Sequence, residues 1–165
     1  MDARVRPLAD IFALNTDLVA NCVADLDSGQ ANRRLPGGGN SIAFLVAHLA
    51  DARYHLLEAL GASAPNPLTE SLGAARSIDD VKNMPSFGAI LSAFRGASAR
   101  LANALDGLKA SDLQRQTTQR FPIDGGTLVD TIAFLAQHES YHVGQMAFIR
   151  RQMGLPPMSY QRSGS

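Results

Sequence analysis

Cysteine is almost absent from this chain, which has one, Cys22, in 165 residues. An internal disulfide needs two cysteines and is therefore excluded. Cys22 lies at helical spacing from Leu18 and Leu26, which predicts a buried thiol rather than a nucleophile. Residues 1–10 carry acids and lack the apolar stretch of a signal peptide. No apolar run approaches the roughly 20 residues that cross a bilayer. We therefore expect a soluble, cytoplasmic protein with no membrane partner.

An excess of positive charge is also missing, because fifteen basic residues are balanced by fifteen acidic ones. Nucleic-acid binders normally carry a basic excess, since neutralising phosphates supplies much of their affinity. The pairs Arg33–Arg34 and Arg150–Arg151 are short, and we interpret each as a solvated helix end or loop. Nucleic acid is therefore not an expected partner. The 45% hydrophobic and 18% charged residues indicate one compact domain over 1–165.

Sustained strand-like alternation is absent as well, whereas four segments place apolar residues at helical spacing. The expected helices cover about 7–27, 41–60, 86–106 and 127–153. Ser28 with Gly29 is expected to end the first helix, while Thr127 and Asp130 have capping-box spacing at the start of the fourth. The tail from Ser159 is expected to be loose. Four long helices without strands predict an all-α four-helix bundle.

Histidines interrupt the apolar faces of two of these helices. His138 and His142 are four residues apart, so they lie on adjacent turns about 6 Å apart along the axis and can share an ion. His48 lies on the apolar stripe of the second helix. The alternative without a metal is that His138 and His142 are ordinary histidines on a partly exposed face. His48 would then be a hydrogen-bonded histidine in the core. Two neighbouring buried imidazoles rarely find separate partners, and a shared metal satisfies both. His55 is about 10.5 Å from His48 along the axis, too far to share that ion.

Two catalytic candidates lie beside the histidines of the fourth helix. Glu139 could be a base near the site, although a solvent-facing position is favoured. Gln145, one turn after His142, could orient a ligand or could be a buried amide bonded to backbone. Tyr141 is expected to be structural. Asp51 either orients the His48 ring or is an ordinary surface acid.

Two better-known metal sites fit the sequence poorly. Residues 138–142 read His-Glu-Ser-Tyr-His, which matches the HExxH pattern of zinc peptidases. That chemistry needs a third, downstream ligand, and no Asp, Glu or His follows His142. A di-iron bundle needs two Glu-x-x-His motifs and two further glutamates. Only one such motif exists here, with Glu58 and Glu70 as the remaining glutamates. A mononuclear site with one upstream ligand is therefore predicted.

The stretch from Asn40 to His48 and the segment His138-Glu-Ser-Tyr-His142-Val-Gly-Gln145 resemble the DinB/YfiT-like superfamily of metal-binding four-helix bundles. The resemblance covers most of the chain. It implies that His48, His138 and His142 are the ligands of one divalent metal ion, with zinc or nickel expected first and iron possible. It also implies a homodimer. Members often carry Trp four residues before the second-helix histidine, where this chain has Phe44 and so lacks the indole N–H.

The same resemblance implies a function. Members of known activity are thiol-dependent transferases or isomerases that use bacillithiol, mycothiol or a related small thiol. Three imidazoles leave open coordination positions, as a catalytic site requires. We therefore expect an S-transferase that joins a small thiol to an electrophilic substrate in stress or detoxification metabolism. The alternatives are a hydrolase that uses metal-activated water, and a metal- or ligand-binding protein without catalysis.

Overall fold

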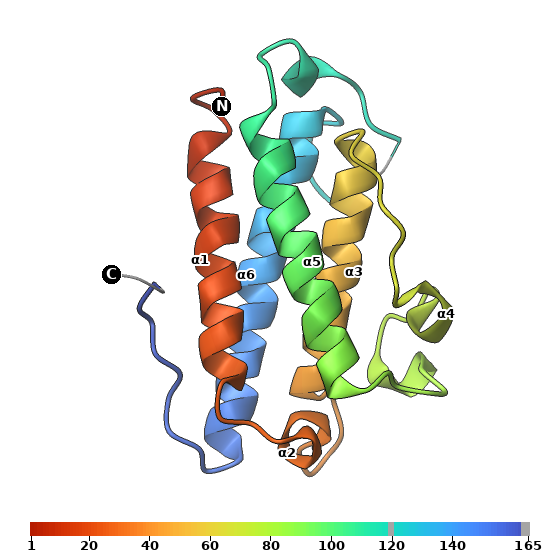
Figure 1. Cartoon of the computed structure of the whole chain (residues 1–165), viewed down its shortest axis with the longest axis vertical. Coiled ribbons are helices and arrows are strands. Elements are labelled where there is room, and N and C mark those ends of the chain that lie inside the picture. Colours follow the sequence, from red (N-terminus) through yellow and green to blue (C-terminus); the bar gives the residue numbers. More distant parts are fainter. Residues whose placement is uncertain (119–120, 163–165) are drawn as a thin grey trace.

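The computed structural model describes residues 1–118 and 121–162. Four long helices run side by side along the molecule (Figure 1). They are α1, Arg6–Val23; α3, Ile42–Ala59; α5, Phe87–Asp106; and α6, Leu128–Gln152. The short elements are α2, Ser28–Asn32; α4, Thr69–Leu72; and the 3-10 turns η1, Ile78–Asp80, and η2, Asp112–Gln114. No strand forms among the described residues, which confirms the predicted all-α four-helix bundle.

Local capping explains most of the helix boundaries. The Ser41 hydroxyl accepts a hydrogen bond from the Phe44 amide at 3.2 Å and starts α3. The Asp130 carboxylate accepts from the Thr127 amide at 3.0 Å in the predicted capping box of α6. The expected end of the first helix is wrong, because α1 already ends at Val23. The Asp27 carboxylate instead accepts a hydrogen bond from the Gln30 amide at 2.7 Å. Asp27 is therefore the N-cap of a new helix, α2, which begins at Ser28.

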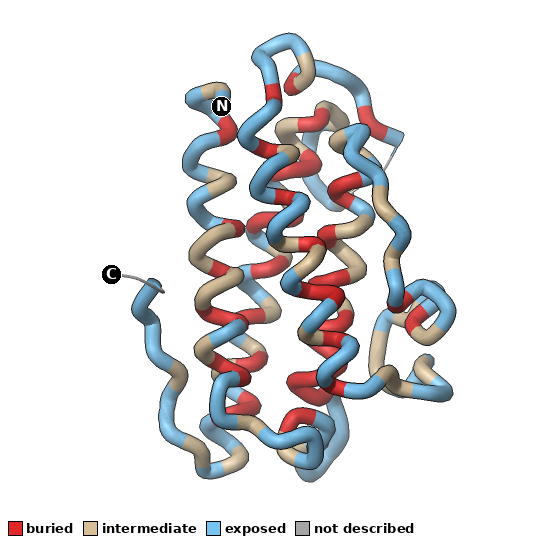
Figure 2. Tube along the Cα trace, viewed as in Figure 1, coloured by how far each residue is buried: buried red, intermediate tan, exposed pale blue. Residues whose placement is uncertain are grey.

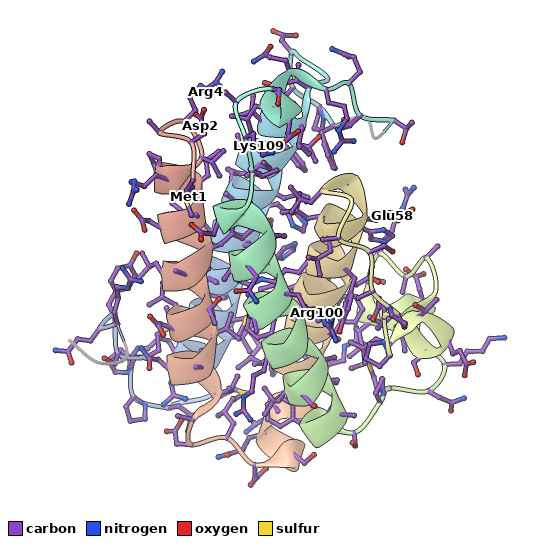
Figure 3. The ribbon with its side chains drawn as sticks, turned by 45° about the horizontal axis from the view of Figure 1, so that its top comes forward. Met1, Asp2, Arg4, Glu58, Arg100 and Lys109 are labelled. Carbon is purple, nitrogen blue, oxygen red and sulfur yellow. The ribbon has the colours of Figure 1, made fainter. Side chains whose placement is uncertain are left out.

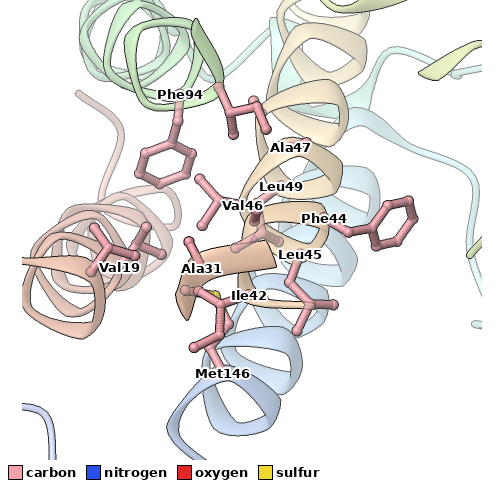
Figure 4. Close-up of a cluster of buried hydrophobic side chains, with 14 of the residues drawn as sticks. Val19, Ala31, Ile42, Phe44, Leu45, Val46, Ala47, Leu49, Phe94 and Met146 are labelled. Atoms are coloured by element: carbon pink, nitrogen blue, oxygen red, sulfur yellow. The ribbon is translucent and has the colours of Figure 1, made fainter. Parts of the chain in front are cut away.

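The core lies between the four long helices. Figure 2 shows buried positions along the inward side of every long helix, and α3 is buried almost throughout from Ile42 to Ala50. Figure 4 shows part of this core, where Val46 of α3 lies toward Phe94 of α5 and Ile42 of α3 lies beside Met146 of α6. Burying each large apolar side chain stabilises the fold by roughly 1.5–3 kcal/mol. These contacts hold α3 and α6, the two histidine-bearing helices, against each other.

Cys22 is buried in this core, as predicted, and burial raises the pKa of its thiol to about 11. The interpretation of Arg150 as solvated is wrong. Its guanidinium is buried and donates to the Asp25 carboxylate at 2.7 Å and to the Cys22 carbonyl at 3.0 Å. This pair ties the end of α6 to the loop after α1. From the sequence alone, Arg150 could be a solvated charge at a helix end or a buried charge on the apolar face. The position of Asp25 beside it decides between the two.

The outer surface carries most of the charge, and Figure 3 shows Glu58 and Arg100 among the side chains there. The Asn21 amide on α1 donates to the backbone carbonyls of Ser159 and Gln161 at 3.0 and 2.8 Å. The tail expected to be loose therefore contacts α1 up to this point, and residues 163–165 lie outside the described range. Among the described residues, no helix is long and apolar enough to cross a membrane.

Candidate metal centre

The three predicted histidines meet at one point between α3 and α6. The Nε2 atoms of His48 and His138 are 3.2 Å apart, and those of His138 and His142 are 3.0 Å apart. One ligand atom from each residue lies within 4.8 Å of the other two. The i, i+4 spacing on α6 supplies two of these nitrogens, and α3 supplies the third from 90 residues earlier.

The spacing of the nitrogens fits a divalent transition metal. Zinc–imidazole bonds of about 2.0–2.1 Å place the nitrogens of a tetrahedral site about 3.3 Å apart, or about 3.0 Å apart on an octahedral face. The 3.2 and 3.0 Å distances match both geometries. Hydrogen bonds among three imidazole nitrogens cannot satisfy the lone pair of each nitrogen. One cation accepts a lone pair from each of the three. His138 Nδ1 is buried without a hydrogen-bond partner in the described part of the chain, so only its Nε2 is engaged.

The imidazoles are held in the neutral form that binds metals. Burial, followed by the neighbouring histidines, lowers the pKa of His48 to about 4. Burial and His142 lower the pKa of His138 to about 4. Burial also lowers the pKa of His142, against opposing contributions from Gln145 and Glu139. Desolvation therefore keeps three lone pairs available near neutral pH.

Aromatic and amide side chains orient the imidazoles. The His142 Nδ1–H donates to the Gln145 Oε1 at 2.7 Å, which leaves the Nε2 lone pair for a metal. The Gln145 amide N–H in turn donates to the Tyr141 hydroxyl at 3.0 Å. The Phe44 ring lies parallel to the His48 ring, with centroids 6.1 Å apart and an interplanar angle of 7°. Phe44 thus keeps the ring contact that a Trp would make, without its N–H.

Comparison with known proteins identifies the family. A family model described as the DinB superfamily matches residues 11–146. The chain belongs to the DinB superfamily. A crystal structure of a conserved protein from Enterococcus faecalis superposes with a TM-score of 0.74 over 93% of this chain and 99% of that chain. The two chains are 17% identical, so this likeness shows the fold alone. A comparison with curated proteins found no match.

In this DinB-superfamily chain Glu139 is not the solvent-facing acid that we expected. It is 1% exposed, and its two carboxylate oxygens accept from Arg53 Nε and Nη2 at 2.7 and 2.8 Å. An HExxH peptidase uses this glutamate as a mobile general base. The bidentate pairing removes that role, which agrees with the rejection of a peptidase. Arg53 was missed from sequence, although it stands in the inward phase of α3 between Leu49 and Leu56.

The remaining polar candidates lie outside the DinB histidine cluster. His55 has a side chain that is 58% exposed, and its Nε2 lies 3.4 Å from the Asp51 carboxylate. Asp51 also accepts a hydrogen bond from the Asn66 amide at 2.7 Å. Asp51 therefore contacts His55 and Asn66 rather than His48. His55 is not part of the cluster, and among the described residues the cluster consists of His48, His138 and His142 only.

Proposed function

We propose that His48, His138 and His142 hold one divalent metal ion and that the chain uses it to transfer a small thiol to an electrophile. The observation that carries this proposal is the convergence of three neutral imidazole nitrogens from two helices. Three protein ligands leave positions for exogenous molecules. When bound, the ion lowers the pKa of a thiol or of water beside it and so supplies a nucleophile near neutral pH. Three imidazoles accept zinc, nickel, iron(II) and copper alike, and we take zinc or nickel first because the family resemblance implies them.

The surroundings of the site favour a thiol over water as the nucleophile. A small thiol has a pKa near 8.5, whereas the pKa of water must fall much further to give a nucleophile near neutral pH. Hydrolases of the HExxH type use a glutamate as general base beside the metal. Glu139, the acid next to His138 in sequence, is held by Arg53 and cannot take that role. Gln145 keeps the proton on His142 Nδ1, which leaves the Nε2 lone pair for the ion.

The experiment compares thiol-dependent consumption of monochlorobimane by the wild type, His138→Ala and His55→Ala, with metal content measured on the same preparations. We expect the wild type and His55→Ala to carry one ion per chain and to consume the electrophile only with thiol. His138→Ala should lose both properties, because two imidazoles cannot retain the ion. Equal metal content in all three proteins would contradict the site. Ester or amide turnover without thiol would favour the hydrolase, and tight metal binding without turnover would favour a binding protein.

A further inference from the structure

An open pocket of about 600 Å³ lies beside the histidine cluster. Its volume falls within the range of about 300–1,000 Å³ that is typical of small-molecule sites. One wall comes from the loop before α3 and from α3 itself, and the other comes from α6. The lining residues are Leu35, Gly38, Gly39, Asn40, Leu45, Tyr141, Gly144, Gln145, Phe148 and Ile149.

The pocket and the metal centre share structural parts. Gln145 lines the pocket and accepts the His142 Nδ1–H hydrogen bond at 2.7 Å. Tyr141 also lines it, and its ring centroid is 5.2 Å from that of His142. Leu45, on the other wall, lies one turn before His48. A molecule in the pocket therefore lies beside Gln145 and Tyr141, which separate it from the His142 ring.

The pocket lining carries no carboxylate, ammonium, guanidinium or imidazole group. Arg34 precedes the glycine loop, but its guanidinium donates to the Gly39 carbonyl at 2.8 Å and to the Asp79 carboxylate at 2.8 Å. Its charge is thus paired rather than offered to the pocket. Burial of an unpaired ion against such walls is unfavourable. The lining therefore favours a molecule, or part of one, that carries no charge.

Two aromatic rings at the pocket remain largely in water. Tyr141 is 57% exposed and Phe148 is 60% exposed, and they are two turns apart on α6. Aromatic rings bury a large apolar area when they meet a partner and prefer stacked or edge-on contact with another ring. Because both rings border the same hollow, an aromatic or branched alkyl group entering it would remove them from water together.

Gly144 keeps the hollow between these rings open. It lies in the middle of α6, where glycine destabilises a helix relative to alanine. A Cβ added there would meet nothing within 4 Å, so neither backbone conformation nor packing requires glycine. A side chain at this position would instead occupy the pocket. The helix thus carries a locally unfavourable residue at a position where a Cβ would stand in open space beside the pocket.

We propose that this pocket binds the uncharged aromatic or branched alkyl part of the electrophilic substrate, an inference that rests on the proposed transfer reaction. The apolar part lies between Tyr141 and Phe148 over Gly144, and the electrophilic carbon points toward the histidine cluster. The pocket thereby selects apolar electrophiles over charged ones.

Binding is tested with unreactive probes, so that the result does not depend on turnover. Benzyl alcohol, benzoate and benzylammonium have the same ring with zero, negative and positive charge. We expect benzyl alcohol to shift the backbone NMR signals of Gly144 and Phe148 and to bind at least about tenfold more tightly than either ion. Equal affinity for all three probes, or shifts confined to other surfaces, would overturn the proposal.

Substitution at Gly144 gives the second measurement, with Gly96→Ala as the matched control. Gly96 lies in the middle of α5, away from the pocket, where an added Cβ makes only an ordinary contact at 3.8 Å with the Tyr54 hydroxyl. Both Gly144→Ala and Gly96→Ala should raise the melting temperature by a few degrees. Only Gly144→Ala and the bulkier Gly144→Leu should weaken benzyl alcohol binding, and Gly144→Leu should weaken it at least about tenfold.

These experiments can contradict the pocket proposal and the transfer reaction independently of each other. Selective benzyl alcohol binding without any thiol transfer would support the pocket and contradict the proposed function. Transfer activity that Gly144→Leu leaves unchanged, with bound metal retained, would contradict the pocket alone. A change in sedimentation coefficient on Gly144→Leu substitution would show that a second copy of the chain covers this face, which would also overturn the proposal.

Discussion

At the scale of single residues, Gln145 determines how His142 can act. Its carbonyl oxygen accepts the Nδ1 proton at 2.7 Å, while its amide N–H is engaged by the Tyr141 hydroxyl at 3.0 Å. The Tyr141 hydroxyl can accept this N–H, which is compatible with the amide oxygen facing the imidazole. His142 is therefore held in the tautomer whose Nε2 lone pair points to the shared site. A hydrogen-bonded imidazole is also a stronger ligand, because its orientation and basicity are set in advance.

Replacing Gln145 with leucine should therefore weaken metal binding without unfolding the helix. We expect the dissociation constant for zinc to rise about 10–100-fold, the usual effect of losing such a partner. Competition with a chromophoric chelator measures it. Gln145→Glu keeps an acceptor for the Nδ1 proton and should bind close to the wild type. Gln137→Leu, at an exposed position of the same helix, is the control. Equal affinities for Gln145→Leu and Gln137→Leu would show that the hydrogen bond plays no part in metal binding.

At the scale of elements, Arg53 joins all four long helices. From α3 it pairs with Glu139 of α6 at 2.7 and 2.8 Å, and it donates to the Thr16 hydroxyl of α1 at 2.9 Å. It also donates to the Ser98 hydroxyl of α5, and its guanidinium carbon lies 4.4 Å from the Phe94 ring centroid. The ion pair is 1% exposed on both sides, so each charge depends on the other for its stability.

Removal of one member of this pair should destabilise the bundle. We expect Glu139→Ala to lower the free energy of unfolding by about 3–5 kcal/mol, because the Arg53 charge stays buried without its partner. Glu58→Ala, at an exposed site, should change it by less than about 0.5 kcal/mol. Urea denaturation measures both values. The double variant Arg53→Met with Glu139→Met should be closer to the wild type than Glu139→Ala. A Glu139→Ala effect as small as that of Glu58→Ala would contradict a structural role for the pair.

At the scale of the whole molecule, the histidine cluster exists only when the bundle is folded. His48 comes from α3, and His138 with His142 comes from α6, 90 residues further along the chain. An unfolded chain keeps the two α6 histidines near each other in sequence but separates them from His48. The proposed metal binding would therefore be coupled to the packing of α3 against α6.

A bound ion should thus stabilise the whole fold. At a free zinc concentration 100 times the dissociation constant, the free energy of unfolding should rise by about 2.7 kcal/mol. Thermal denaturation with zinc and with excess chelator measures this difference. The gain should disappear in His48→Ala and persist in His55→Ala. An equal zinc effect in His48→Ala would mean that the ion binds elsewhere in the chain.

Local sequence was sufficient to predict the features that depend on neighbouring residues. Ser41 and the pair Thr127–Asp130 satisfy amides within one turn, so the starts of α3 and α6 followed from residue type and spacing. The i, i+4 relation of His138 and His142 is likewise a property of one helix. The early end of α1 was missed because Asp27 can belong to a helix end or to a new cap, and both are locally acceptable.

Pairings between distant residues were decided by the tertiary structure alone. Glu139 looks like a surface charge within its own helix, and the inward phase of Arg53 does not reveal its partner. Only the packing of α3 on α6 brings the two within 2.7 Å and away from water. The same packing determines that His48 completes the cluster and that His55 does not. Apolar periodicity gives the inward face of each helix but not the rotation and axial position of one helix against another. Those depend on side-chain contacts across the whole core.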